Sequence, residues 1–382
     1  MWKRNSVSAE GRGIRKMIDK GENGMMMIHG CEPLFAGIDF CGEYPKVCYQ
    51  DAQMKEPEYL PLDFGGCFGQ AACFRKILSA LKRFGKKEGI RAVVVVSDTS
   101  EESILKYLKN ACEAGFEREQ LRVIGELESI VHFVMHQTND IWQQRVYLLE
   151  FDTDEIKVSS VWVNRRVTPM LAEAQEPEYW HVGTLLEGNR DERLLEYVKE
   201  RFAKELVSAV FLTGTDFNAR DYKKSREEIC RRRRVFLGEQ LHARGACMLA
   251  GDACEKKTYL FLSEQTLLYN VGIRSIGAGR ESVQTIISAG CSWYEVEESF
   301  EMLLYGDPVL EFSFCSMLGG KPIAAGMTLT DLPARPDGAA RLLMEIHFSG
   351  SSRCEVKVTD LGFGEIYPAS DLCWKESFVL EE

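Results

Sequence analysis

Apolar and polar residues alternate in two ways between residues 34 and 254. The run 90–98 (IRAVVVVSD) is continuous and rich in β-branched residues, which is typical of a strand buried on both faces. Residues 71–89 instead repeat apolar side chains at helical spacing and end in basic residues that suit a helix C-terminus. The same reasoning predicts two strands within 34–50, a hairpin at 145–164, strands at 121–126 and 207–217, and helices at 100–115, 127–137, 190–206, 223–234 and 235–251. Strands that alternate with helices predict a layered α/β fold, and the hairpins within it indicate a mixed sheet.

The pattern changes near Lys257, where short strand-like segments separated by Gly, Pro and Asp predict an all-β module. We therefore expect three parts: a flexible extension at 1–33, an α/β domain at 34–254 and a β-sandwich at 255–382. We find no internal repeat in the sequence.

Composition narrows the class of protein. The chain has 382 residues, 47 of them basic and 58 acidic, and its net charge is −11. This length predicts two or three domains. An acidic chain is a poor general binder of nucleic acid or anionic membrane, so we expect neither partner. The 13 cysteines form no CxxC pair, which favours reduced thiols in a cytoplasm. We expect no membrane-spanning helix and no secretion signal.

Three stretches carry candidate chemistry. A strand, Asp39 and a turn fall within 35–45, and a strand, Asp152 and a second hairpin turn fall within 147–158. A third strand ends in a glycine turn at Gly214. A nucleotide clamp needs three such stretches in this order along the chain. Two hairpins hold the phosphates of the nucleotide from opposite sides, and a glycine turn approaches its sugar and base closely. The order predicts a two-lobed nucleotide clamp.

The residues in these stretches resemble the actin-like ATPase superfamily, with its ribonuclease H-like fold, and within it the seventy-kilodalton heat-shock (DnaK-type) chaperones. The resemblance rests on Gly37-Ile38-Asp39-Phe40 and on residues 93–131, 147–161, 209–217 and 236–251. It continues into the β module at 258–276 and 329–365, which resemble strands of the chaperone's substrate-binding sandwich. Each motif alone is weak, but their order and spacing are specific.

The resemblance implies roles for individual residues. It puts Gly37, Asp39, Gly42, Asp152 and Gly214 at nucleotide-binding positions. Glu126 matches the family's catalytic carboxylate, and Asp39 and Asp152 match positions near its magnesium ion. If the site is functional, its cofactor is therefore ATP with magnesium. The resemblance also implies that the sandwich grips extended peptide.

This chain departs from the family at both phosphate motifs. Glu43 adds a carboxylate where polyphosphate lies in the family, and Pro45 removes an amide donor. The second motif, 151–155, has no glycine and adds two carboxylates, so its backbone does not approach phosphate closely. The segments between the motifs are shorter than in the family, so we expect reduced outer subdomains and no helical lid. These departures predict a site that does not hydrolyse ATP.

Our leading hypothesis is a cytoplasmic, bacterial-type, degenerate DnaK-like protein that binds a protein or peptide and needs no cofactor. Two alternatives stay open: an active ATP-dependent chaperone-like or kinase-like enzyme, and an actin-like scaffold or assembly protein. The sequence does not define the client or the oligomeric state.

Several residues have two interpretations each. Asp39 and Asp152 either position a metal or cap turns, and we favour turn-capping. Glu126 is either a catalytic base or, as we favour, a solvated residue at a helix start.

His132 and His136 have zinc-ligand spacing but no third ligand, so we favour ordinary surface or core histidines. The basic segment at 223–234 is interleaved with glutamates, which favours a solvated helix face over an anion or RNA site. Cys41 has few basic neighbours, so we expect an inert thiol.

Overall fold

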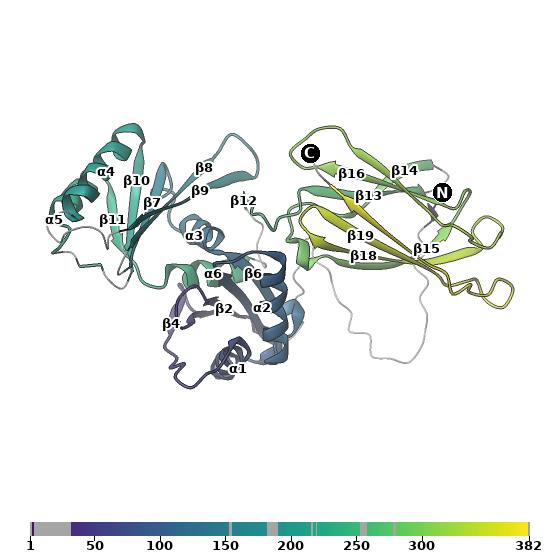
Figure 1. Ribbon diagram of the computed structural model, residues 1–382, viewed down its shortest axis with the longest axis horizontal. Coiled ribbons are helices and arrows are strands. Elements are labelled where there is room, and N and C mark those ends of the chain that lie inside the picture. Colours follow the sequence, from purple (N-terminus) through teal and green to yellow (C-terminus); the bar gives the residue numbers. More distant parts are fainter. Residues whose placement is uncertain are drawn as a thin grey trace. The chain divides into compact units, whose positions relative to one another are not determined.

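The structure is a computed structural model that describes residues 2–3, 32–152, 155–181, 190–214, 217–218, 220–252, 258–277 and 280–380. The chain divides into two compact units after Phe261. We call the described residues from 32 to 261 the α/β unit. The β unit is 262–380 together with the N-terminal residues that cluster with it (Figure 1). Most of the predicted extension, 1–33, lies outside the described residues.

The first sheet of the α/β unit is mixed and has the strand order β4-β3-β2-β5-β6. Its strands are β2 (Leu34–Asp39), β3 (Lys46–Asp51), β4 (Glu58–Leu60), β5 (Ile90–Val96) and β6 (Leu121–Gly125). β3 runs antiparallel to β2, whereas β5 and β6 run parallel to it. Val93 and Val95 of β5 pack against helix α6 (Leu241–Asp252). Val94 is also buried, and its side chain alternates to the opposite face, so the strand is covered on both faces as predicted.

The second sheet is also mixed, and its strand order is β11-β10-β7-β8-β9-β12. Its strands are β7 (Arg145–Phe151), β8 (Glu155–Asn164), β9 (Met170–His181), β10 (Val207–Thr213), β11 (Arg234–Leu237) and β12 (Tyr259–Phe261). Val146 and Leu148 of β7 pack with α3 (Glu126–Met135). Tyr147 and Leu149 alternate to the other face and pack with α4 (Arg190–Lys204) and α5 (Lys223–Ile229). Both faces of this sheet are therefore covered.

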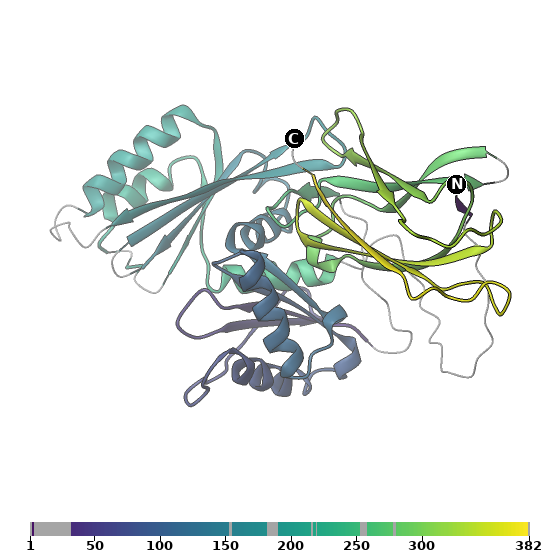
Figure 2. The same cartoon turned by 45° about the vertical axis from the view of Figure 1, so that its right-hand side comes forward.

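Three predictions in this region need correction. The predicted hairpin at 145–164 continues into a third long strand, β9, which pairs with β8 (Figure 2). The predicted helix at 235–251 begins only at Leu241, because Arg234–Leu237 pairs with β10 as strand β11. The charged helix predicted at 223–234 ends at Ile229.

The two sheets repeat one connectivity, although no repeat is visible in the sequence. In the first sheet a three-stranded meander is followed by α1 (Gln70–Leu81), β5, α2 (Glu101–Glu113), β6 and α3. In the second, β7, β8 and β9 are followed by α4, β10, α5, β11 and α6. Each terminal helix packs on the other sheet's strands: α3 on β7 and α6 on β2 and β5. The two helices also pack against each other between the sheets.

The β unit consists of two antiparallel sheets, as the all-β pattern predicts. One has the order β14-β13-β16-β17, with β13 (Tyr269–Gly277), β14 (Arg280–Ile287), β16 (Val309–Ser316) and β17 (Ile323–Thr328). The other has the order β1-β15-β18-β19-β20, with β1 (Trp2–Lys3), β15 (Glu297–Leu304), β18 (Ala340–Gly350), β19 (Arg353–Asp360) and β20 (Cys373–Val379). Phe312 and Phe314 of β16 pack on Phe378 of β20, at centroid distances of 5.2 and 5.4 Å. The sheets therefore face each other as a sandwich.

Among the described residues, every helix is too short or too polar to cross a membrane.

Candidate functional site

The turn after β2 is closed by the side chain of Asp39. Asp39 is only 4% exposed, and its Oδ1 accepts a hydrogen bond from the Cys41 amide at 2.9 Å. The Phe40 amide donates to the Val95 carbonyl at 3.0 Å and so extends the pairing with β5. Asp39 therefore acts as the turn-capping residue that we favoured. Of the residues that depart from the family motif, Glu43 is exposed and Pro45 is buried.

The three candidate glycines have different structural roles. At Gly37 a Cβ atom would lie 1.9 Å from the Ala243 carbonyl oxygen, so this glycine lets α6 pack directly on β2. At Gly42 the nearest atom to a Cβ would be 3.8 Å away, so the backbone does not require glycine there. Gly214 has a φ of 113°, and a Cβ there would lie 2.0 Å from the Phe151 carbonyl oxygen. Gly214 therefore brings the end of β10 against the end of β7, and Gly37 and Gly214 are both packing glycines.

The second motif is a hairpin turn between β7 and β8. The amide of Asp152 donates to the Glu155 carbonyl at 2.9 Å, and the side chain of Asp152 is exposed. Thr153 and Asp154 of this motif lie outside the described residues.

Glu126 lies in an ion pair between the two sheets. It is the first residue of α3, directly after β6, and its Oε1 accepts a hydrogen bond from Ser97 Oγ at 2.7 Å. Its Oε2 pairs with the ammonium group of Lys157 on β8. The two side chains are only 19% and 15% exposed. Glu126 is therefore a helix-start residue as we favoured, but it is not solvated, because the fold brings a cation from the second sheet onto it.

The Lys157 ammonium group is surrounded by acidic groups. Besides Glu126, it lies 3.7 Å from Oε2 of Glu150. Burial lowers the pKa of Lys157, while the charge of the nearby Asp39 opposes this change. Burial, and next the charge of Asp39, raise the pKa of the Cys41 thiol far above its usual range. The thiol is therefore protonated at neutral pH, in agreement with the inert role that we expected.

His242 of α6 joins Glu150 to α3. Its Nε2 lies 2.9 Å from Glu150 Oε1, and its Nδ1 lies 2.8 Å from Ser129 Oγ. Ser129 Oγ donates its own proton to the Glu126 carbonyl at 2.6 Å, so it accepts a hydrogen bond from His242. Both ring nitrogens of His242 therefore have a hydrogen-bond partner.

Ser129, His242 and Glu150 contain the groups of a nucleophilic triad, but their geometry argues against one. Ser129 is 0% exposed, and its hydroxyl proton is directed to a backbone carbonyl. A serine nucleophile needs its oxygen open to substrate and its proton directed to the histidine. The three residues therefore have a structural role.

We call Ser97, Glu126, Ser129, Glu150, Lys157 and His242 the interlobe ring. The interactions run from Ser97 through Glu126, Lys157, Glu150, His242 and Ser129, and return to the Glu126 backbone. The members come from β7 and β8 of the second sheet, from α3 and α6, and from the end of β5 in the first sheet. Glu126 and Glu150 are its acidic members, and Lys157 and His242 are its basic members. Of these six residues, sequence reasoning identified only Glu126.

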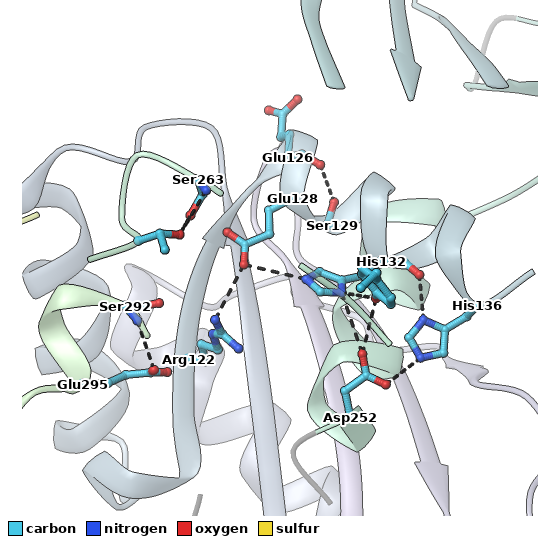
Figure 3. Close-up of polar contacts among 12 residues, drawn as sticks. Arg122, Glu126, Glu128, Ser129, His132, His136, Asp252, Ser263, Ser292 and Glu295 are labelled. Atoms are coloured by element: carbon cyan, nitrogen blue, oxygen red, sulfur yellow. Dashed lines mark hydrogen bonds and ion pairs between the residues drawn. The ribbon is translucent and has the colours of Figure 1, made fainter. Parts of the chain in front are cut away.

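His132 and His136 belong to a second polar cluster with Arg122, Glu128 and Asp252 (Figure 3). Tyr259 also belongs to this cluster, through its hydroxyl group. His132 Nδ1 lies 2.6 Å from the Tyr259 hydroxyl, and burial lowers the pKa of His132. His136 Nε2 lies 2.7 Å from Asp252 Oδ1, and its Nδ1 lies 2.7 Å from the His132 carbonyl. The described part of the chain contains no group of three His, Cys, Asp or Glu side chains that holds a metal. His132 is buried and His136 is exposed, so they are the core and surface histidines that we favoured.

The basic segment after α4 is paired with acidic and aromatic side chains. Lys224 pairs with Glu192 at 2.7 Å, and Arg231 pairs with Glu228 at 3.1 Å. The Arg233 guanidinium lies 4.2 Å from the centroid of the Phe202 ring. These contacts fit a solvated helix face better than an RNA site.

Two mixed sheets of equivalent topology, with α3 and α6 packed between them, make the α/β unit an actin-like domain. The interlobe ring lies where the two sheets of such a domain meet.

The chain belongs to the family described as "Family of unknown function (DUF5716) C-terminal", whose model matches residues 71–264, just over half of the chain. Residues 266–380 match a second model, described as "Domain of unknown function (DUF8552)". No curated protein matches the chain.

The chain is similar to several solved structures at low identity. The inorganic polyphosphate/ATP-glucomannokinase of Arthrobacter sp. strain KM is 10% identical over 57% of this chain and 98% of that chain, with a TM-score of 0.36. The ethanolamine utilization protein EutJ of Carboxydothermus hydrogenoformans is 12% identical over 57% of this chain and 90% of that chain, with a TM-score of 0.35. A Bacteroides thetaiotaomicron protein with an actin-like ATPase fold and unknown function is 12% identical over 60% of this chain and all of that chain, with a TM-score of 0.32.

Proposed function

We propose that this chain is a divergent DnaK-like protein of the bacterial cytoplasm that acts by binding a protein or peptide. In this proposal the actin-like domain is a pseudo-ATPase. Its two lobes, each built around one of the two sheets, are held together without nucleotide. The interlobe ring is the observation that carries the proposal. In this ring the carboxylate of Glu126, which matches the catalytic position of the DnaK-type chaperones, is paired with an internal cation, Lys157.

The residues around the ring do not fit magnesium-ATP. A magnesium ion beside Glu126 would lie next to the Lys157 ammonium group, and like charges a few ångströms apart repel strongly in a partly dry site. Removal of Lys157 from the ring would leave Glu126 without its cation, which is costly for a largely buried carboxylate.

Two backbone positions of the first phosphate motif are also already occupied by the protein itself. α6 covers the backbone at Gly37, and the Cys41 amide is already hydrogen-bonded to Asp39. Loss of a single donor to a developing negative charge lowers a catalysed rate by about 10²–10³. The loss of several donors therefore supports a domain that does not hydrolyse ATP.

The β unit supports the binding part of the proposal. It is an antiparallel sandwich, and residues 258–276 and 329–365 resemble a chaperone sandwich that grips extended peptide. Extended peptides bind such scaffolds through main-chain hydrogen bonds to strands and through pockets for alternate side chains.

Calorimetry with magnesium-ATP tests the pseudo-ATPase part. We expect no binding at micromolar protein and no phosphate release above the buffer rate. The same calorimetry is carried out on Lys157→Ala, which lacks the internal cation. Lys55→Ala is the matched control, because Lys55 is an exposed lysine outside the ring. Micromolar affinity together with turnover by the wild-type chain would refute this part.

A peptide array probed with the full chain tests the binding part. We expect retention on extended apolar peptides and none on the same peptides with proline at alternate positions. Equal retention on both sets, or on neither, contradicts peptide binding by strand pairing.

A further inference from the structure

The edge of strand β15 is paired with the first residues of the chain. β1, only two residues long, runs antiparallel to β15, with Trp2 opposite Leu304 and Lys3 opposite Leu303. Strand β18 pairs with the other side of β15 along its whole length. Without β1, β15 would therefore be the edge strand of its sheet. β1 also lies close to β13 of the facing sheet.

Charge gives a second and independent reason for this pairing. Residues 262–382 contain 18 acidic and 8 basic residues, so the β unit carries nearly all of the chain's net charge of −11. Three of the eight residues of β15 are glutamates: Glu297, Glu298 and Glu301. The first 17 residues carry five basic side chains and one acidic one. Opposite net charges on the first 17 residues and on the β unit attract each other at long range.

We propose that the edge of β15 is a binding surface for an extended basic segment, and that the chain's own N-terminus occupies it as an added strand. Main-chain hydrogen bonds give such a strand its affinity, and charge gives it a preference for basic sequences. The N-terminus then acts as an internal ligand that competes with any external segment of the same chemistry. This inference rests on the proposed peptide-binding function of the β unit and adds where and what it binds.

The first test measures the internal contact with no external peptide. In Trp2→Pro/Lys3→Pro the backbone loses two amide donors, and in Trp2→Ala/Lys3→Ala, the matched control, it keeps them. We expect hydrogen exchange of a peptide covering Leu303 and Leu304 to be about tenfold faster in the proline variant and near wild-type in the alanine variant. Equal exchange in all three proteins contradicts the internal strand.

The second test measures the surface itself. A labelled peptide with the sequence of residues 1–17 is added to the proline variant and to the wild-type chain. We expect it to bind the proline variant at least tenfold more tightly and to be released as the salt concentration rises. A peptide with glutamate in place of its lysines and arginines is the control, and we expect it not to bind.

The outcomes separate this inference from the proposed function. Binding of the basic peptide to neither protein overturns the β15 surface, even if apolar peptides are retained on the array. Failure on the array, with the basic peptide still bound to the proline variant, overturns the apolar-peptide function and leaves the β15 surface in place.

Discussion

Replacement of Lys157 by methionine tests whether the interlobe ring holds the α/β unit together. The variant keeps most of the side-chain volume but leaves Glu126 and Glu150 with no ammonium partner. Removal of one partner of a buried pair costs about 3–5 kcal/mol. Because the two side chains of the main pair are still 15% and 19% exposed, we expect about 2–3 kcal/mol here.

A double-mutant cycle separates the pair from its surroundings. We expect Lys157→Met/Glu126→Gln to be less destabilised than the sum of the single variants by at least about 1 kcal/mol, because it leaves no uncompensated charge at Glu126. Urea unfolding followed by hydrogen exchange in α3 and β8 reports the α/β unit separately from the β unit. A loss below about 0.5 kcal/mol for Lys157→Met, or strict additivity in the cycle, would refute the reasoning.

Three further predictions concern other parts of the molecule. The buried Asp360 accepts hydrogen bonds from Arg335, Ser370 and the Gly362 amide, which outweigh burial and lower its pKa to about 2. The low pKa of Asp360 adds stability at pH values above its usual pKa of 3.8, and this stability is lost as the pH falls towards about 2. Arg335→Met should therefore unfold at a higher pH than wild type in an acid titration followed by circular dichroism. Identical titrations of the two proteins would contradict this prediction. Gly37→Ala forces a methyl group onto α6 and should lower the melting temperature, whereas Gly42→Ala should not; equal melting temperatures would exclude the packing role of Gly37. Burial lowers the pKa of His132 below its usual 6.5, so the wild-type protein should lose stability as the pH falls below about 6.5. His132→Gln should lose less stability over the same pH range. The same pH dependence in both proteins would show that His132 does not cause this loss.

The fold was largely predictable because its signals are local. The β-branched run 90–96 had to be a strand covered on both faces, and α2 begins after Ser100, whose hydroxyl accepts the Ser103 amide as an N-cap. Strand β9 was missed because its 12 residues carry Pro177 and several glutamates, which weaken a strand pattern. Its pairing with β8, a tertiary interaction, overrides that weak local preference. The repeated topology was invisible for a related reason: connectivity repeats without any repeat of residues.

The candidate site was only partly predictable. Asp39 and Glu126 were found because Asp39 is the last residue of one strand and Glu126 directly follows another. Lys157 and His242 gave no local signal: one is a polar residue in a strand and the other a polar residue at a helix start. Only the packing of α3 and α6 between two sheets brings these residues onto Glu126 and Glu150. An ion pair between distant segments has no counterpart in local sequence.

A crystal structure of the full chain grown with excess magnesium-ATP tests the central claim most directly. The account predicts that Lys157 remains paired with Glu126 and that no nucleotide lies between the two sheets. A nucleotide bound there with magnesium near Asp39 or Asp152, and Lys157 displaced from Glu126, would contradict it.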